Sequence, residues 1–214
     1  MLVGAGLLAA GAAAAGPTVR DTPAGAAAAR ISLLSTTDLG KGWTTVGKAG
    51  TSGLQVDCPG WEPSEKGIVQ TGSASSPDFT GGTSGPFIVQ LTSVYASAAE
   101  ASTLWTRAVK PGLITCVTQT LDSITAKGIK VKILSQGPLA VQKVGAMSAA
   151  YRVVADLTST KTGRRLKTYF DVLLVGHGKT LSEITLSTFG GAVPSKVEYA
   201  LAFVVYRRIS LPIA

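Results

Sequence analysis

The sequence predicts an α+β domain in which an antiparallel β-sheet is packed against helices. Three observations lead to this fold class. Strand-like stretches precede a helical stretch, four further strand-like stretches follow it, and a last helical stretch lies near the end of the chain. The last three of these four stretches are separated only by short turns, which join antiparallel strands. A length of 214 residues, 45% of them hydrophobic, is enough for a single domain with its own core.

The first 29 residues differ in composition from the rest of the chain. Residues 1–16 are apolar and carry no charge. An apolar run followed by small residues is typical of a secretory signal peptide, and residues 13–15 and 27–29 both fit a cleavage site. A disordered Ala/Gly-rich tail is the alternative. We therefore predict a signal peptide or disordered segment over 1–29, a single domain over 30–214, and a secreted or extracytoplasmic location.

The predicted domain opens with short elements. Residues 35–39 predict a short capped helical turn, and a strand is expected near 43–46. Residues 48–65 are rich in glycine, proline and serine and predict a loop. Further strands are expected over 67–76 and 87–96. Along the last of these strands, four apolar residues fall on one face at period two: Phe87, Val89, Leu91 and Tyr95.

Two helices are predicted after these strands. Ser97 and Glu100 have the spacing of a capping box, in which each side chain accepts from the other residue's backbone N–H. The helix that begins here must end before Pro111, because proline breaks a helix interior. A second helix is expected over 112–126, where apolar residues recur at helical spacing: Leu113, Val117, Leu121 and Ile124.

Four strands and one helix complete the predicted domain. Apolar and polar residues alternate along these strands, and short turns join the last three, so we expect an antiparallel meander. The last helix is expected from Pro194, with a second capping box that includes Ser195 and Glu198. The predicted strands are 129–133, 151–158, 166–175 and 180–188.

Two cysteines, Cys58 and Cys116, are the only ones in the chain. In an exported protein an even number of cysteines indicates a disulfide, here one that would tie the loop over 48–65 to the helix over 112–126. In a cytosolic protein the same two residues would be unpaired buried thiols. The disulfide prediction therefore depends on the prediction of a signal peptide.

Catalytic and metal-binding patterns are sparse. The single histidine, His177, lies between two glycines in a predicted turn, and we interpret it as a solvated turn residue. Two cysteines and one histidine also disfavour a metal site, and no cofactor motif is found. Asp156 and Asp171 lie in neighbouring predicted strands, where paired acids could serve glycoside hydrolysis. Cross-strand ion pairs with nearby basic residues are the simpler interpretation.

The net charge of +8 is the remaining functional signal. Such a charge attracts anionic partners, although it can also serve solubility alone. Nucleic acid is not expected, because no nucleic-acid-binding signature and no aromatic residues interleaved with the basic ones are found. For an exported protein, acidic lipid or an anionic cell-wall polymer is the better candidate. The basic residues gather in two stretches: Lys161, Arg164, Arg165 and Lys167, and Lys127, Lys130, Lys132 and Lys143.

The order of these motifs resembles the extracellular sensor-type domain of mycobacterial serine/threonine kinase H, together with related actinobacterial secreted proteins and lipoproteins. The resemblance covers residues 31–210 and rests on residues 33–43, residues 94–101, Cys58 and Cys116. It implies an antiparallel sheet with helices that enclose a ligand-binding cleft. Since this chain has no kinase region, it implies no role coupled to a kinase. The chain is also similar to the sheet-and-helix sandwich of photosystem-P and Mog1-like proteins.

These observations lead to one main functional hypothesis. We expect an exported, non-catalytic domain of the bacterial cell envelope that binds an anionic or amphiphilic ligand, with peripheral contact to a membrane surface as one form of it. A small cell-wall hydrolase, for instance one that uses serine with lysine, and a structural partner of the envelope are the alternatives. The candidate contacts are Arg164, Arg165 and Lys167 for charge, with Trp43, Trp61 and Tyr169 as apolar walls.

Overall fold

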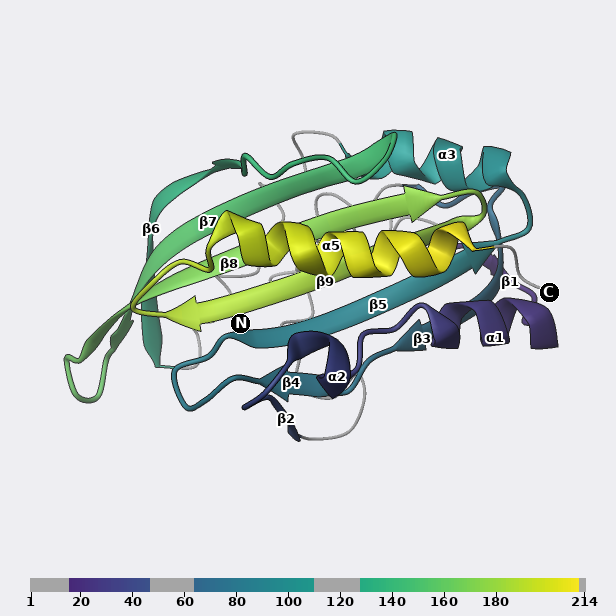
Figure 1. Cartoon of the computed structure of the whole chain (residues 1–214). Coiled ribbons are helices and arrows are strands. Elements are labelled where there is room, and N and C mark those ends of the chain that lie inside the picture. Colours follow the sequence, from purple (N-terminus) through teal and green to yellow (C-terminus); the bar gives the residue numbers. More distant parts are fainter. Residues whose placement is uncertain (1–15, 47–63, 110–127, 212–214) are drawn as a thin grey trace, which may run out of the picture.

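The computed structural model describes residues 16–46, 64–109 and 128–211 and has the predicted α+β architecture (Figure 1). A mostly antiparallel sheet of nine strands forms one layer, and helices pack against it. In chain order the elements are β1 (Thr18–Val19), α1 (Pro23–Ile31), α2 (Thr36–Leu39), β2 (Thr44–Val46), β3 (Val69–Ser75), β4 (Asp78–Thr80), β5 (Phe87–Tyr95), α3 (Ala98–Ala108), β6 (Ile129–Pro138), β7 (Met147–Ser159), β8 (Arg165–His177), β9 (Thr180–Phe189) and α5 (Ser195–Ser210).

The predicted meander forms the larger part of the sheet. Strands β6, β7, β8 and β9 pair in sequence order, each antiparallel to the next. Strand β9 then pairs with β5, which pairs with β3, and the short β1 adds to β3 in parallel. The short strands β2 and β4 pair with each other, and β4 also pairs with the start of β5. The pairing order along the sheet is thus β1-β3-β5-β9-β8-β7-β6.

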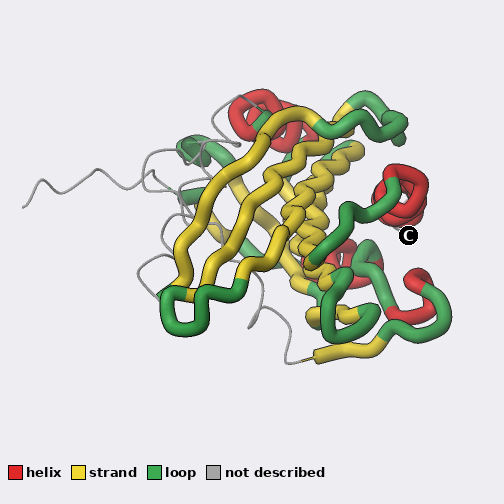
Figure 2. The backbone as a smooth tube through the Cα atoms, turned by 90° about the vertical axis from the view of Figure 1, so that its left-hand side faces the viewer, coloured by secondary structure: helices red, strands yellow, loops and turns green. Residues whose placement is uncertain are grey.

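The long helix α5 lies across β8 and β9 on one face of the sheet (Figures 1 and 2). We call this side the α5 face and the opposite side the far face. Apolar side chains from helix and sheet fill the space between the two layers, so this interface is a packed core. Its buried members are Leu34, Phe79, Ile88, Val144, Leu173, Val175, Ile184, Leu186, Val193, Leu201, Ala202 and Val205.

Strand β5 buries a different face from the one its apolar pattern suggests. Leu91, one of the apolar period-two residues, is 47% exposed. The alternate residues on the α5 face are buried instead, including the polar Gln90 and Thr92, which are fully buried. Gln90 is satisfied there by hydrogen bonds to Leu34 N, Ser32 O and the hydroxyls of Thr92 and Ser182. Buried polar groups are tolerated when such partners are present.

Helix α1 belongs to the folded domain, although it lies within the segment for which we predicted a signal peptide or disorder. The Thr22 hydroxyl caps its first turn by accepting from Gly25 N at 3.0 Å, and Ala28 and Ala29 are buried against the sheet. The helix crosses β3 at a glycine pair: a Cβ on Gly25 would lie 2.2 Å from Thr71 O, and one on Gly72 would lie 2.3 Å from Gly25 C. The folded part of the chain therefore begins before residue 30, while residues 1–15 lie outside the described ranges.

One of the two predicted capping boxes forms: Ser97 and Glu100 cap α3 with reciprocal side-chain to backbone hydrogen bonds. The predicted capped turn over 35–39 forms α2, where Ser35 N donates to Asp38 Oδ2 at 2.7 Å. The second predicted capping box, at Ser195 and Glu198, does not form. Pro194 is the N-cap of α5 and provides no side-chain hydrogen bond. Glu198 instead turns toward the sheet and is fully buried, because an arginine of β7 pairs with it there.

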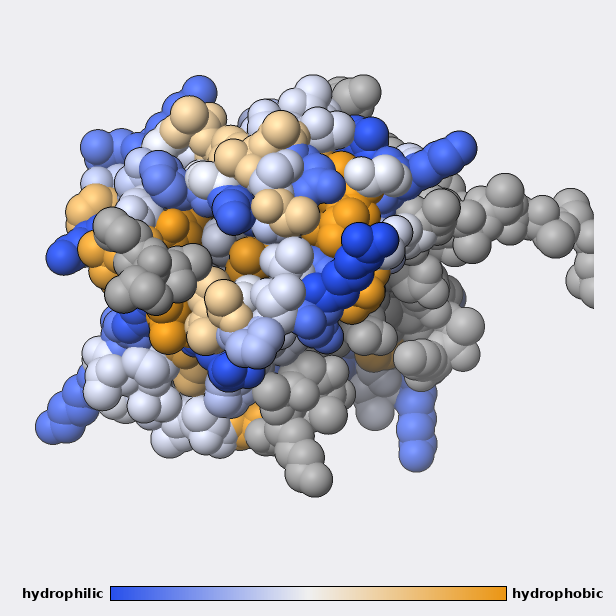
Figure 3. Space-filling view, turned by 90° about the vertical axis from the view of Figure 1, so that its right-hand side faces the viewer, coloured by the Kyte–Doolittle hydropathy of each residue, from blue (hydrophilic) through white to orange (hydrophobic). Residues whose placement is uncertain are grey.

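Helix α3 packs against the far face, near the ends of β5 and β9. Its residues Ala101 and Leu104 form a buried cluster with Ile68 and Tyr95. The helices thus contact both faces of the sheet, and not one face alone. At this end of the molecule, hydrophobic residues appear as separate patches among hydrophilic side chains (Figure 3).

Several sequence predictions lie outside the described ranges. They are the helix over 112–126, both cysteines of the predicted disulfide (Cys58 and Cys116) and Trp61. Among the helices of the described ranges, none is both long and apolar enough to cross a membrane.

Candidate functional site

Three strands extend beyond the end of β9 and form a separate tip of the sheet. The pairing of β9 with β8 ends at Thr168 opposite Phe189, so the first residues of β8 pair only with β7. The tip consists of residues 129–133 of β6, 155–159 of β7 and 165–167 of β8, with the turn over 160–164 at its end. We call this region the basic tip. It projects past the start of α5 (Figures 1 and 2).

The strand register brings the two predicted basic stretches together on the α5 face of this tip. Lys132 lies opposite Asp156, which lies opposite Lys167. In the next row, Lys130 lies opposite Thr158, which lies opposite Arg165. Directly opposite residues have Cβ atoms about 5 Å apart, and all four cationic side chains are exposed. One row therefore contains a carboxylate between two lysines, while the other contains two cations and no acid.

The far face of the same tip is apolar. Val131 lies opposite Leu157, which lies opposite Leu166. Leu166 is 43% exposed, and Val131 and Leu157 are partly buried. The basic tip is therefore amphipathic across its thickness, with cations on one side and aliphatic side chains on the other.

The candidate contacts from the sequence fall into two groups. Arg164, Arg165 and Lys167 are exposed at the basic tip, and Tyr169 follows Lys167 on the same face, half-buried beneath the Arg152 guanidinium at 5.8 Å. Trp43 lies elsewhere: it packs against the main core beside β4, and β5 and β9 separate β4 from β8. Lys143 lies in the segment between β6 and β7, away from the tip. Trp61 and Lys127 are outside the described ranges.

Arg152 is the centre of a buried charge network next to Tyr169. Its guanidinium binds Asp171 through both ends, Nε to Oδ1 at 2.6 Å and Nη2 to Oδ2 at 2.8 Å. Nη2 also donates to Glu198 Oε1 at 2.7 Å and to Val193 O at 3.2 Å. Asp171 is 1% exposed and Glu198 is fully buried. One arginine thus serves two carboxyl groups and connects β7, β8 and α5.

Two acids beside one arginine cannot both be ionised at low cost in a buried place. Burial, followed by the hydrogen bond and charge of Asp171, raises the pKa of Glu198 to about 8, against the opposing effect of Arg152. Glu198 Oε2 faces no hydrogen-bond donor. A proton on this oxygen, shared with the Asp171 carboxylate, satisfies it. Of the two acids, Glu198 is therefore the one whose protonated form the surroundings favour.

The two acids that the sequence paired for glycoside hydrolysis are not brought together. Asp156 lies opposite Lys167, and Asp171 lies opposite Arg152. Neither Asp171 nor Glu198 is among the described lining residues of the two cavities considered below. His177 is exposed in the β8–β9 turn, with its ring edge against Tyr206 at 5.7 Å between centroids. The described ranges also bring no three metal-ligating side chains together.

The first cavity lies between α5 and the segment that joins β6 to β7. It has a volume of about 180 Å³, and Lys143, Ser148, Tyr151 and Ala202 are among its lining residues. Serine and lysine therefore occur in one cavity, but its lining includes no carboxylate. The hydrogen bond of the Ser148 hydroxyl is with Val144 N, at 3.4 Å.

Comparisons with known proteins leave the family of this chain open. No protein-family model matches the sequence, and no curated protein matches it either. Among solved structures, protein PA94 from Pseudomonas aeruginosa, a protein of unknown function, is similar at 12% sequence identity with a TM-score of 0.24. The match covers 72% of this chain and 85% of the other. Any function must therefore be argued from the residues of the site.

Proposed function

We propose that this chain is an exported, non-catalytic domain that binds the anionic lipid surface of a bacterial envelope through its basic tip. The observation that carries this proposal is the cross-strand register of the tip, which sets Lys130 and Arg165 in one row and Lys132 and Lys167 in the next. Lys130 and Arg165 lie two strands apart, about 10 Å, on either side of Thr158. This row contains no acid that would neutralise the two cations, so it can bind an anionic group of a partner.

The apolar side of the tip favours a lipid surface over a simple polyanion. Leu166 is exposed next to the cations of the same strand, so one element offers both charge and aliphatic area. Peripheral membrane proteins combine these two features, and each basic residue near an anionic lipid surface contributes about 1 kcal/mol. A soluble polymer such as polyphosphate would use the charge alone.

The proposed export is consistent with the position of α1. Cleavage within residues 27–29 would cut this helix, which spans Pro23–Ile31, whereas cleavage within 13–15 would leave every described element intact. We therefore favour the earlier of the two candidate cleavage sites. N-terminal sequencing of secreted protein tests this choice, and a mature chain beginning after residue 29 would contradict it.

Vesicle co-sedimentation tests the lipid proposal. We expect the protein to bind phosphatidylglycerol vesicles and not phosphatidylcholine vesicles, with binding that weakens as salt is raised. The double substitution Lys130→Glu/Arg165→Glu removes both cations of the acid-free row. At about 1 kcal/mol for each cation, the loss of affinity is roughly 30-fold or more.

The control variant reverses two charges at the other end of the sheet. Arg20→Glu/Lys179→Glu changes the net charge by the same amount, and both side chains are exposed. We expect this variant to keep most of the binding, because a long-range charge effect is screened at physiological salt. If both variants lost the same amount of vesicle binding, the tip would act only through the net charge of the protein and not as a specific site. Binding to polyphosphate but not to phosphatidylglycerol vesicles would overturn the lipid part of the proposal.

A further inference from the structure

A second cavity lies on the far face, on the opposite side of the sheet from α5. Helix α3 forms one wall and strands β5, β8 and β9 form the floor. Its volume is about 150 Å³, which is the size of an engineered protein cavity that binds benzene. The apolar part of its lining consists mainly of leucines: Leu91, Leu104, Leu174 and Leu181.

Glu183 brings a carboxyl group into this apolar floor. It lies on β9 between Leu91 of β5 and Leu174 of β8, which are its direct neighbours across the sheet. The Thr185 hydroxyl donates to its Oε1 at 3.2 Å. Its surroundings are apolar enough that burial raises the pKa of Glu183, and the Thr185 hydrogen bond opposes this only in part. Part of the side chain nevertheless stays accessible, and it lines the cavity.

Glu65 and Tyr95 also line this cavity. Arg107, in the last turn of α3, donates to the backbone carbonyls of Ser64 and Lys66, and so holds the segment that carries Glu65 against the helix. Burial raises the pKa of Tyr95 to about 12, with the charge of Glu65 adding to the effect and the Ser93 hydrogen bond opposing it. The Tyr95 hydroxyl is therefore neutral at physiological pH, and the Glu65 carboxyl group lines the same cavity.

Trp105 completes the lining from α3. An indole ring attracts cations through its π-system, and it gives a flat wall for an apolar or aromatic group. Among the described residues, the lining thus combines aliphatic walls, two aromatic rings and two carboxyl groups, and it includes no lysine, arginine or histidine.

We propose that this cavity binds a small organic cation, namely an ammonium group carried on an apolar body about the size of a benzene ring, with Glu183 as its counter-ion. An anionic ligand would face two carboxyl groups, with no cation among the described lining residues. A neutral apolar ligand of the same size would bring no positive charge to balance the Glu183 carboxylate. This site is independent of the basic tip, which lies at the other end of the sheet and takes the opposite charge.

Titration calorimetry with benzylamine tests the proposal, and benzyl alcohol and benzoate serve as matched probes of nearly the same shape. We expect benzylamine to bind the full chain at least tenfold more tightly than benzyl alcohol, and benzoate to bind less tightly than either. Comparable affinities for benzylamine and benzyl alcohol, or no binding of benzylamine at millimolar concentration, would overturn the proposal. This comparison uses the unaltered protein, so it does not depend on the folding of a variant.

The substitution Glu183→Gln tests whether Glu183 causes the preference for benzylamine over benzyl alcohol. We expect it to remove the tenfold preference for benzylamine while benzyl alcohol binds as before. The control Asp156→Asn removes one carboxylate on the other side of the sheet and is expected to leave both affinities unchanged. If Glu183→Gln retains the preference, Glu183 is not the counter-ion.

Proton release gives a second readout. Because the binding of an ammonium group favours ionised Glu183, benzylamine should displace a proton from this carboxyl at a pH below its raised pKa. Calorimetry in two buffers of different ionisation enthalpy measures that proton. The release should disappear in Glu183→Gln, and release of equal size in the variant would contradict the assignment.

Discussion

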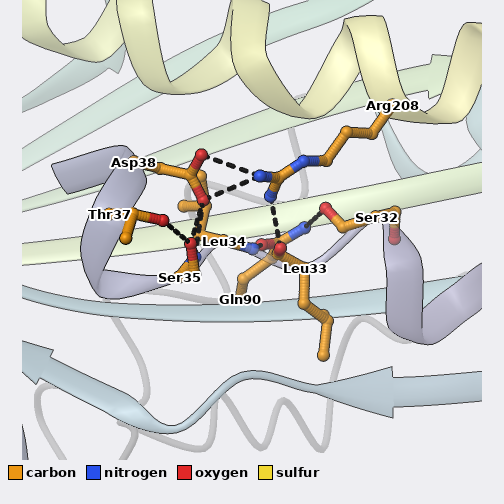
Figure 4. A network of polar contacts seen from close by, with 8 residues as sticks. All are labelled: Ser32, Leu33, Leu34, Ser35, Thr37, Asp38, Gln90 and Arg208. Atoms are coloured by element: carbon orange, nitrogen blue, oxygen red, sulfur yellow. Dashed lines mark hydrogen bonds and ion pairs between the residues drawn. The ribbon is translucent and has the colours of Figure 1, made fainter.

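Two arginine networks hold the two ends of α5, and they differ in the number of acids that each arginine serves. At the start of the helix, Arg152 binds both Asp171 and Glu198. At the end of the helix, Arg208 binds one acid among the described residues, Asp38, at 2.7 and 2.9 Å, and also donates to Leu33 O (Figure 4). The first network joins the helix to β7 and β8, and the second joins it to α2.

The difference in acid count gives the two networks opposite responses to protonation. Burial opposes ionisation of Asp38, but hydrogen bonds from Ser35 and the guanidinium of Arg208 outweigh it and lower the pKa of this carboxyl. The pKa of Glu198 is raised to about 8 by its burial and by Asp171. The second carboxyl group at Arg152 therefore favours a protonated acid, whereas the single carboxyl group at Arg208 stays ionised. The comparison predicts that the start of α5 weakens as pH rises and its end weakens as pH falls.

Removal of Arg152 is expected to have the largest effect. Arg152→Met would leave Asp171 and Glu198 buried without a cation, and the loss of one partner from a buried ion pair costs about 3–5 kcal/mol. Urea unfolding at pH 7 measures this change. Arg208→Met is the matched control, because Asp38 is 14% exposed and can be hydrated, and it should cost less than half as much. Equal costs would show that the second acid contributes nothing.

Local signals in the sequence were sufficient for most helices and strands. The capping box at Ser97 and the capped turn that begins at Ser35 each involve residues only three positions apart, and both form as predicted. The meander was also predictable, since short turns leave antiparallel pairing as the simple choice. These features depend on neighbours in the chain, which a single sequence displays directly.

Residues with distant partners were not predictable in the same way. Gln90 suggests an exposed position, yet it is fully buried because Leu34 N, 56 positions away, donates to its side chain. Glu198 has the spacing of a capping residue, but Arg152, 46 positions away, draws it into the core. Helix α1 was missed because its Ala/Gly composition also fits a signal peptide. Its role depends on the close approach of Gly25 to Gly72.

The basic tip shows what the sequence could provide for the site. Both basic stretches were recognised from composition, but only the register between β6, β7 and β8 shows that Lys130 and Arg165 share a row. Trp43 was grouped with this site because it is aromatic, and the strand order separates it from the tip. The cavity around Glu183 had no sequence signal, since its lining comes from four separate elements and the segment before β3.

The substitution Glu198→Gln tests the proton held by the Arg152 network. The folded state keeps this proton up to about pH 8, whereas the unfolded chain loses it near pH 4.3. The free energy of unfolding contributed by this group is therefore complete below the unfolded pKa and declines as pH rises toward 8. Each pKa unit corresponds to about 1.4 kcal/mol, and part of the shift belongs to the pair with Asp171 and not to Glu198 alone, so we expect a decline on the order of 2 kcal/mol.

Glutamine at position 198 has no titratable proton. The difference in unfolding free energy between wild type and Glu198→Gln therefore isolates the contribution of the Glu198 carboxyl group. Urea unfolding of both proteins at several pH values between 5 and 9 should show wild type losing stability relative to the variant as pH rises. A constant difference over this range would mean that Glu198 is ionised throughout and shares no proton with Asp171.

The smallest effect is expected at the other end of α5. Asp38→Asn removes a partly exposed ion pair with Arg208 and weakens the capping box of α2, at a cost of about 1 kcal/mol at pH 7. Because the pKa of Asp38 is lowered in the folded state, its contribution is present above the unfolded pKa of about 3.9 and is lost as pH falls further. The difference in unfolding free energy between wild type and Asp38→Asn should therefore shrink from pH 7 to pH 3, opposite in direction to the Glu198→Gln series. A difference that grows toward low pH would place a raised pKa at both ends of α5 and remove the contrast between the two networks.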